Sequence, residues 1–168
     1  EKSILPEVFF GLYPEEIEFQ RNVSKLADIA MTAARESLAP GIREYEVAAE
    51  AEYAMMKHGA WGTSFPTIVS SGERSAFCHG WTGDRKLTKG DLVIVDLGPQ
   101  AHGYAADESR TFLVGKDERK EKMMVAVDKA VAAVLENIKP RANCRELDAI
   151  ARKVFKERGF PDIPHGIG

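Results

Sequence analysis

An internal repeat constrains the fold of this chain more than any other feature of its sequence. Residues 38–60, LAPGIREYEVAAEAEYAMMKHGA, can be written above residues 138–160, IKPRANCRELDAIARKVFKERGF, without a gap. A constant offset of one hundred residues then aligns several residues of the same type: Pro40 with Pro140, Glu46 with Glu146, and Gly59 with Gly159. Because a proline, an acidic residue and a terminal glycine recur together, we interpret the two segments as copies of one helix–turn–helix unit.

The hydrophobic pattern predicts the elements around this repeat. Helical spacing of apolar residues predicts helices over residues 15–38, 43–58, 119–138 and 144–158. Runs rich in β-branched and aromatic residues predict strands over residues 66–70, 91–97 and 105–114. The sequence therefore predicts an α+β fold with repeat units at about 15–114 and 115–168. The second copy ends nine residues after Gly159, so we expect this half to be incomplete and to lack its strands.

Composition excludes several classes of partner. The net charge of −3 gives no reason to expect a nucleic acid or an acidic membrane as a partner. The longest apolar runs are too short to cross a bilayer, and we find no signal peptide. Two cysteines, Cys78 and Cys144, do not make a disulfide framework. These features predict a cytoplasmic location.

Two aspartates occupy an unexpected place in residues 90–112, GDLVIVDLGPQAHGYAADESRTF. If the hairpin turns between Ala101 and His102, Asp96 and Asp107 are directly opposed, with Cβ atoms about 4.5–5.5 Å apart. Two half-buried carboxylates at that distance repel each other and need a positive partner. Strand alternation directs Arg110 to the other face, so one or two divalent cations are a better partner.

An ordinary structural role is the alternative to a metal site for these two aspartates. A single aspartate in a strand is more often a turn residue or a member of an ion pair, and for Asp96 alone we favour that interpretation. For Asp96 together with Asp107, opposed in one hairpin and preceded by His79, we favour a metal site. The sequence therefore predicts Asp96 and Asp107 as metal ligands.

His79 and His165 are the histidines with a predicted role in the site. His79 lies seventeen residues before Asp96 and is followed by Gly80, which leaves room for a ligand. It could donate a hydrogen bond to a substrate or bind metal. We discount thiol catalysis by Cys78, because neighbours along a strand point to opposite faces. His165, in DIPHGIG, is either a site residue or a turn residue, and we favour the site.

These motifs resemble those of the pita-bread metallopeptidases, which include methionine aminopeptidases, Xaa-Pro aminopeptidases, prolidases and creatinases. Asp96 matches the aspartate of a VDLG motif, and Asp107 matches the aspartate of a motif like GYAADESRTF. A substrate-contacting histidine seventeen residues before the first aspartate matches His79. The segments SFPTIVSSGERSAFCHG and KGDLVIVDLG are more similar to the prolidase and Xaa-Pro branch. The resemblance extends over essentially the whole chain.

The resemblance implies a fold, a cofactor and a reaction. The fold would be two pseudo-symmetric helix–helix–sheet halves. The site would hold two divalent metal ions (Mn, Co, Fe or Zn) through two Asp, one His and two Glu, and a water bridging the metals would attack the first peptide bond. Asp96 and Asp107 match the two Asp ligands, whereas both Glu lie beyond Gly168, so we expect the chain alone to be inactive. His165 aligns either as the metal-binding histidine or, as we favour, as a second, substrate-contacting histidine just before it.

The implied function is that of an Xaa-Pro dipeptidase (prolidase) or Xaa-Pro aminopeptidase acting on peptides or dipeptides. A methionine aminopeptidase is the alternative within the family. From another class, a protein of this fold can be an inactive binding module or an inactive fragment. Loss of activity usually shows in the Asp motifs, and both are intact here. The prolidase branch usually carries a separate domain ahead of this one, and a homodimer is an assembly that the resemblance leaves open.

Overall fold

The computed structural model describes residues 11–77 and 79–160, which form two compact units, one within residues 1–115 and the other within residues 116–168. The described residues combine helices with antiparallel strands, so the predicted α+β class is confirmed. Among them, no helix is both long and apolar enough to span a membrane.

Two helices open the first unit. Helix α2 spans Pro14–Ser37 and α3 spans Glu44–Lys57. Pro14 suits the first turn of α2 because the nitrogen there needs no intrahelical partner. Gly59 ends the second helix in a left-handed conformation, with φ at 109°. Both helices agree with the predicted ranges to within a residue or so.

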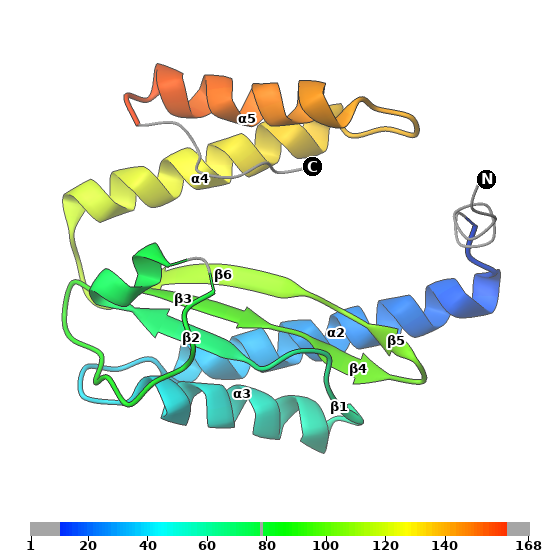
Figure 1. Ribbon diagram of the computed structural model, residues 1–168, viewed down its shortest axis with the longest axis horizontal. Helices are drawn as coiled ribbons and strands as arrows, with labels where there is room; N and C mark the ends of the chain where they lie inside the picture. Colours follow the sequence, from blue (N-terminus) through cyan, green and yellow to red (C-terminus); the bar gives the residue numbers. More distant parts are fainter. Residues whose placement is uncertain (1–10, 78, 161–168) are drawn as a thin grey trace, which may run out of the picture. The chain divides into compact units, whose positions relative to one another are not determined.

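Among the described residues of this unit, six strands form two three-stranded antiparallel sheets (Figure 1). The larger sheet has the order β2–β3–β6, with bounds Ile68–Ser71, Leu92–Leu97 and Glu108–Leu113. The smaller has the order β1–β4–β5, with bounds Gly62–Thr63, Pro99–Ala101 and Tyr104–Ala105. A short 3-10 helix, η1, spans Gly72–Ala76 after β2.

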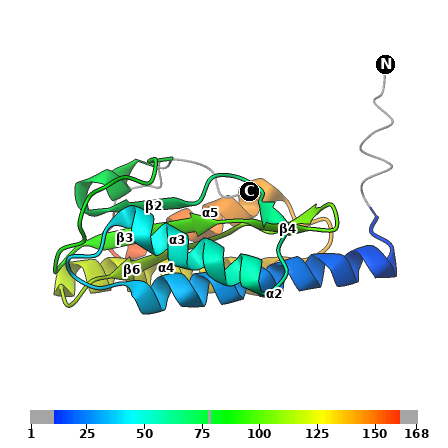
Figure 2. The ribbon, with the colours of Figure 1, turned by 90° about the horizontal axis from the view of Figure 1, so that it is seen from below.

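The larger sheet has two unlike faces. Val93, Val95 and Leu97 alternate along β3 and are fully buried in one core with the apolar residues of α2 and α3. The two helices run side by side along that face (Figure 2). Asp96 lies between two of these buried positions, and strand alternation therefore places it on the opposite face. We call that opposite side of the β2–β3–β6 sheet the open face.

The hairpin register differs from the predicted one. The turn is formed by His102 and Gly103, both at positive φ, and not by Ala101 and His102. Asp96 consequently pairs with Ser109 and not with Asp107, so the predicted direct opposition is wrong. The physical reason is the turn chemistry: this turn has positive φ at both central positions, which Gly103 adopts at no steric cost, whereas an alanine at position 101 would be strained there.

The second unit is a helical hairpin. Helix α4 spans Glu118–Asn137 and α5 spans Cys144–Glu157. Asn143 caps α5 by accepting a hydrogen bond from the Arg145 amide at 3.0 Å. Like α3, α5 has fourteen residues and ends two residues before a glycine at positive φ. In α5 this glycine is Gly159, with φ at 74°.

Candidate active site

A cavity of about 400 Å³ lies on the open face of the sheet within the first unit. Seven residues line it: Phe65, Pro66, Ile68, His79, Trp81, Asp96 and Asp107. Three of the four residues predicted for the site, both aspartates and His79, are therefore brought to one cavity. The fourth, His165, lies outside the described residues, as does Cys78.

Strand β3 positions Asp96. The residue is half-buried, and its Oδ1 accepts a hydrogen bond from the Ser109 hydroxyl at 2.6 Å. Ser109 is the cross-strand partner of Asp96, so the two side chains emerge on the same face. A carboxylate held this way keeps further lone pairs free for another ligand.

Asp107 lies in the short connection between β5 and β6. It stands two positions before Ser109, the cross-strand partner of Asp96, which makes it a diagonal neighbour of Asp96 and not a direct partner. Partial burial raises the pKa of the Asp107 carboxyl group, and the charge of Asp96 and a hydrogen bond with it raise that pKa further.

Gly98, the glycine of the VDLG motif, lies in a crowded place. It stands two residues after Asp96 and directly follows β3. A Cβ atom at Gly98 would overlap the Ser64 hydroxyl, the Ala106 carbonyl oxygen and the Phe65 ring. The glycine of the VDLG motif thus allows a close approach of backbone segments beside the carboxylates.

No basic side chain of residues 11–77 and 79–160 is recorded in an ion pair with Asp96 or Asp107. Arg110 instead pairs with Glu108, at 3.0 Å, on the opposite face of β6. This arrangement agrees with the predicted orientation of Arg110. The repulsion between the two aspartates is therefore left for another cation to relieve.

These residues fit a divalent metal ion as a partial ligand set. Carboxylate oxygens are the donors that hard divalent cations prefer, and two of them face one cavity. Within the described ranges, no group of three or more His, Cys, Asp and Glu side chains could hold a metal ion. The aspartate pair would accordingly supply part of the coordination, with His79 beside it.

His79 is exposed at the edge of the cavity. The next residue, Gly80, was expected to leave room for a ligand, and the structure gives a further reason for a glycine at this position. A Cβ atom at Gly80 would lie 2.9 Å from the Ser70 hydroxyl oxygen. Gly80 therefore lets the loop cross closely over β2. Ser70 Oγ is buried and has no hydrogen-bond partner among the described residues.

A buried carboxylate anchors the loop after His79. Glu44, at the start of α3, has no exposed surface. It accepts hydrogen bonds from the Ser71 amide at 2.9 Å, the Ser71 hydroxyl at 2.7 Å and the Gly83 amide at 2.9 Å. Its Oε2 also lies 3.5 Å from Arg74 Nε, an ion pair without good hydrogen-bond geometry. Glu44 thus ties the edge of β2 to the loop that carries His79.

Sequence reasoning did not identify Glu44, Phe65 or Trp81. For Trp81 a signal was present, because a large aromatic residue stands two residues after His79 and is followed by the polar run TGDRK. For Glu44 there was none, since an acidic residue in the first turn of a helix is ordinarily solvated.

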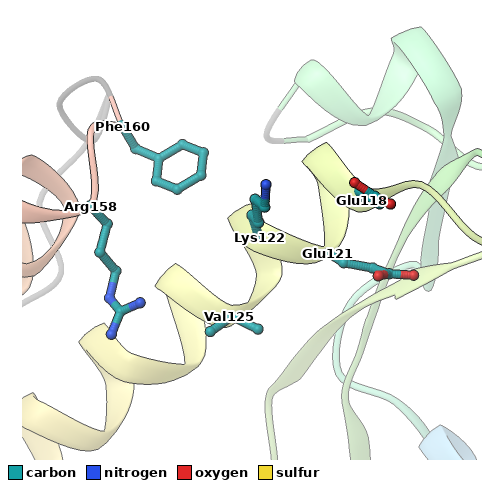
Figure 3. A pocket seen from close by; sticks show the side chains of 6 residues that line it. All are labelled: Glu118, Glu121, Lys122, Val125, Arg158 and Phe160. Atoms are coloured by element: carbon teal, nitrogen blue, oxygen red, sulfur yellow. The ribbon is translucent and has the colours of Figure 1, made fainter.

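A second cavity, of about 530 Å³, lies within the second unit (Figure 3). Lys122 and Val125 of α4 line it together with Arg158 and Phe160, which follow α5. Glu118 and Glu121 point away from Phe160 in this view. Since acidic and basic groups do not converge there on a common point, we place the candidate active site at the cavity with Asp96 and Asp107.

Comparison with known proteins identifies the family. The model of metallopeptidase family M24 matches residues 18–168. This chain belongs to that family. The M24 assignment confirms the resemblance drawn from the VDLG and GYAADESRTF motifs, and it implies divalent metal ions without giving their number or identity.

Individual relatives specify the branch. The chain is 41% identical over 160 residues to the Xaa-Pro dipeptidase of Pyrococcus furiosus, covering 92% of this chain and 46% of that protein. The solved prolidase from Pyrococcus furiosus superposes with a TM-score of 0.88 at 39% identity, covering 93% of this chain and 47% of that one. An Escherichia coli aminopeptidase P in complex with substrate gives a TM-score of 0.83 at 29% identity, over 87% of this chain and 34% of that one.

The M24 chain therefore has the pita-bread fold of the prolidases and aminopeptidases P. It spans a little less than half the length of the curated relatives it matches, 46% of the Pyrococcus furiosus protein.

Proposed function

We propose that this chain contributes the aspartate pair of a dinuclear metal-dependent exopeptidase of the Xaa-Pro dipeptidase type. The observation that carries the proposal is the convergence of Asp96, Asp107 and His79 on one cavity of the open face. The branch is supported by the similarity to the Pyrococcus furiosus Xaa-Pro dipeptidase over 92% of this chain.

The chain's own residues have separable tasks in this proposal. Asp96 and Asp107 hold divalent cations, Mn, Co, Fe or Zn, and Ser109 orients Asp96 by its hydrogen bond. His79, exposed at the edge of the same cavity, donates a hydrogen bond to the substrate or to the departing amine. When bound, the cations supply Lewis-acid stabilisation of the developing charge and lower the pKa of water to near neutrality.

Substrate preference follows the branch. The names of the relatives include Xaa-Pro dipeptidase and aminopeptidase P, which favours dipeptides and peptides with proline in the second position. A methionine aminopeptidase would instead cleave Met-Ala well. The intact Asp motifs favour an enzyme over an inactive binding module, because such modules usually lose the metal-holding residues.

Metal binding tests the site directly. Calorimetric titration of the 168-residue chain with Mn²⁺ or Co²⁺ should give weak binding that Asp96→Asn or Asp107→Asn abolishes. Asp84→Asn is the matched control, because Asp84 is an exposed aspartate of the same unit and does not line the cavity. Equal metal affinity in all three variants would contradict the assignment of the ligands.

Hydrolysis tests the reaction. The complete protein, loaded with Mn²⁺ or Co²⁺, should cleave Ala-Pro in preference to Met-Ala. Asp96→Asn should lower kcat/KM for Ala-Pro by at least about a hundredfold, because the asparagine amide binds cations poorly. Preferential cleavage of Met-Ala would assign the protein to the methionine branch instead.

A further inference from the structure

Trp81 is the most exposed large hydrophobic residue of the candidate active site, with 75% of its surface accessible. It lines the same cavity as Asp96, Asp107 and His79. An indole on a protein surface favours burial against another apolar group. The position of Trp81 beside the aspartate pair therefore points to contact with whatever binds there.

The chain is held at Trp81 and at the two residues that follow it. Arg74, which pairs with buried Glu44, donates a hydrogen bond to the Trp81 carbonyl oxygen. Thr82 donates to the Thr67 carbonyl oxygen at 2.7 Å and accepts from the Val69 amide at 2.8 Å.

Gly83 is bound on two sides as well, its amide to Glu44 at 2.9 Å and its carbonyl oxygen to the Tyr45 amide at 3.2 Å. A loop anchored at three successive residues holds Trp81 at a defined place, although most of the Trp81 surface is exposed. Such preorganisation is typical of binding residues, since little conformational freedom is lost when the ligand arrives.

The other tryptophan of the chain provides a contrast. Trp61 is 66% exposed, but its ring lies 4.7 Å from the His102 ring, which stacks in turn on Phe19. Trp61 therefore supports the β4–β5 hairpin against α2. Within the described part of the chain, no aromatic ring stacks on Trp81. Exposure alone does not separate the two residues, but their surroundings do.

We propose that Trp81 is a specificity-determining residue whose indole contacts the apolar side chain of the first residue of the substrate. This inference rests on the proposed function. Two aromatic walls border the cavity, and they differ in exposure: Phe65 is half-buried against Gly98, beside the aspartates, whereas Trp81 stands at the exposed side. A proline ring has one fixed shape and suits an enclosed subsite, while the variable first residue needs an open one.

Kinetics on a matched substrate series tests the assignment. The complete protein and its Trp81→Ala, Trp81→Phe and Trp61→Phe variants are assayed on Leu-Pro and Gly-Pro. Trp81→Ala should lower kcat/KM about tenfold for Leu-Pro and less than about twofold for Gly-Pro, which has no side chain at the first position. The loss should reside in KM with kcat nearly unchanged, because the contact lies away from the reacting atoms. Trp81→Phe should restore most of the Leu-Pro activity, and Trp61→Phe should leave both substrates unaffected.

The outcomes are distinguishable. An equal loss for Leu-Pro and Gly-Pro, or no loss for either, overturns the role of Trp81 while the proposed function stands. If the unaltered protein cleaves neither dipeptide, the proposed function fails, and this inference fails with it. Since Trp81 is mostly exposed, both of its variants are expected to fold, and unchanged circular dichroism spectra check that expectation.

Discussion

Two helices of this protein, α3 and α5, were predicted to be copies of one unit, and they lie in different surroundings. Each has fourteen residues, each is followed by a glycine at positive φ, and each buries an alanine at the same position, Ala51 and Ala151. They differ at their first residue. In α3 this is Glu44, which is fully buried and binds the Ser71 and Gly83 backbone, whereas in α5 it is the exposed Cys144.

The difference shows what belongs to the repeat and what belongs to the site. Residues shared by both copies form the hairpin, its turn and its helix end. The residue that organises the candidate active site is found in one copy alone, because it acts through contacts with β2 and the loop after His79 that lie outside the repeated segment. The following changes test this comparison.

Replacing Glu44 should have the largest effect. Glu44→Gln places an amide group against the Ser71 and Gly83 donors and removes the charge opposite Arg74. We expect a loss of about 3 kcal/mol in the free energy of unfolding. Urea denaturation followed by far-ultraviolet circular dichroism measures this loss, because both units contain helices.

The matched control is Cys144→Ala at the equivalent position of α5. It should change stability by less than about 0.5 kcal/mol, because an exposed side chain at a helix start contributes little. Similar effects at both positions would contradict the distinction between the two helices.

Replacing Asp91 should have an intermediate effect that depends on pH. Burial would raise the pKa of Asp91, but hydrogen bonds from Arg85 and Thr88 and the charge of Arg85 outweigh it, so the pKa lies below its ordinary value. The Arg85–Asp91 pair therefore stabilises the fold above about pH 4 and loses its contribution as the pH falls through the lowered pKa. Asp91→Asn should cost about 2 kcal/mol at pH 7, somewhat less than for a fully buried pair.

The pH profile distinguishes this loss from general damage. Unfolding curves of Asp91→Asn and of the unaltered chain are compared at pH 7 and at about pH 2. The free energy of unfolding should differ between the two proteins at pH 7 and not at about pH 2. In the second unit, the exposed Lys153–Glu157 pair serves as control. Glu157→Gln should cost less than about 0.5 kcal/mol at either pH. A destabilisation by Asp91→Asn that is the same at both pH values would argue against the ion pair as its cause.

The smallest effect is expected in the turn before each of the helices α3 and α5. Both turns contain a residue at positive φ, but this residue is a glycine in one and an arginine in the other. Gly41 has φ at 94°, and the equivalent Arg141 has φ at 65°, a conformation that L side chains adopt at a cost. Arg141→Gly should stabilise the α4–α5 hairpin by up to about 1 kcal/mol, and Gly41→Ala should destabilise the first unit by a similar amount. Hydrogen exchange of α4 and α5 measures the first effect. Slower exchange in Arg141→Gly is expected, and faster exchange would contradict the argument.

Much of the fold was predictable because its signals are local. Helix ranges followed from the spacing of apolar residues. The strand predicted over 105–114 is interrupted at Ala106 and Asp107. These two residues connect β5 of the smaller sheet to β6 of the larger sheet and belong to neither strand. A one-dimensional pattern does not reveal that break.

The sequence by itself determined the α+β class, and it predicted the repeat and the two aspartates as metal ligands, because apolar periodicity and short motifs are properties of neighbouring residues. Only the tertiary structure decided the hairpin register, the burial of Glu44 and the meeting of Trp81 with Asp96 and Asp107 in one cavity. These features depend on contacts between residues dozens of positions apart, such as the bond from the Ser71 amide to Glu44. The Ser71 amide lies in β2, an edge strand of its sheet, and a backbone group at an edge needs a partner from outside the sheet. Only the folded chain brings the Glu44 carboxylate to it.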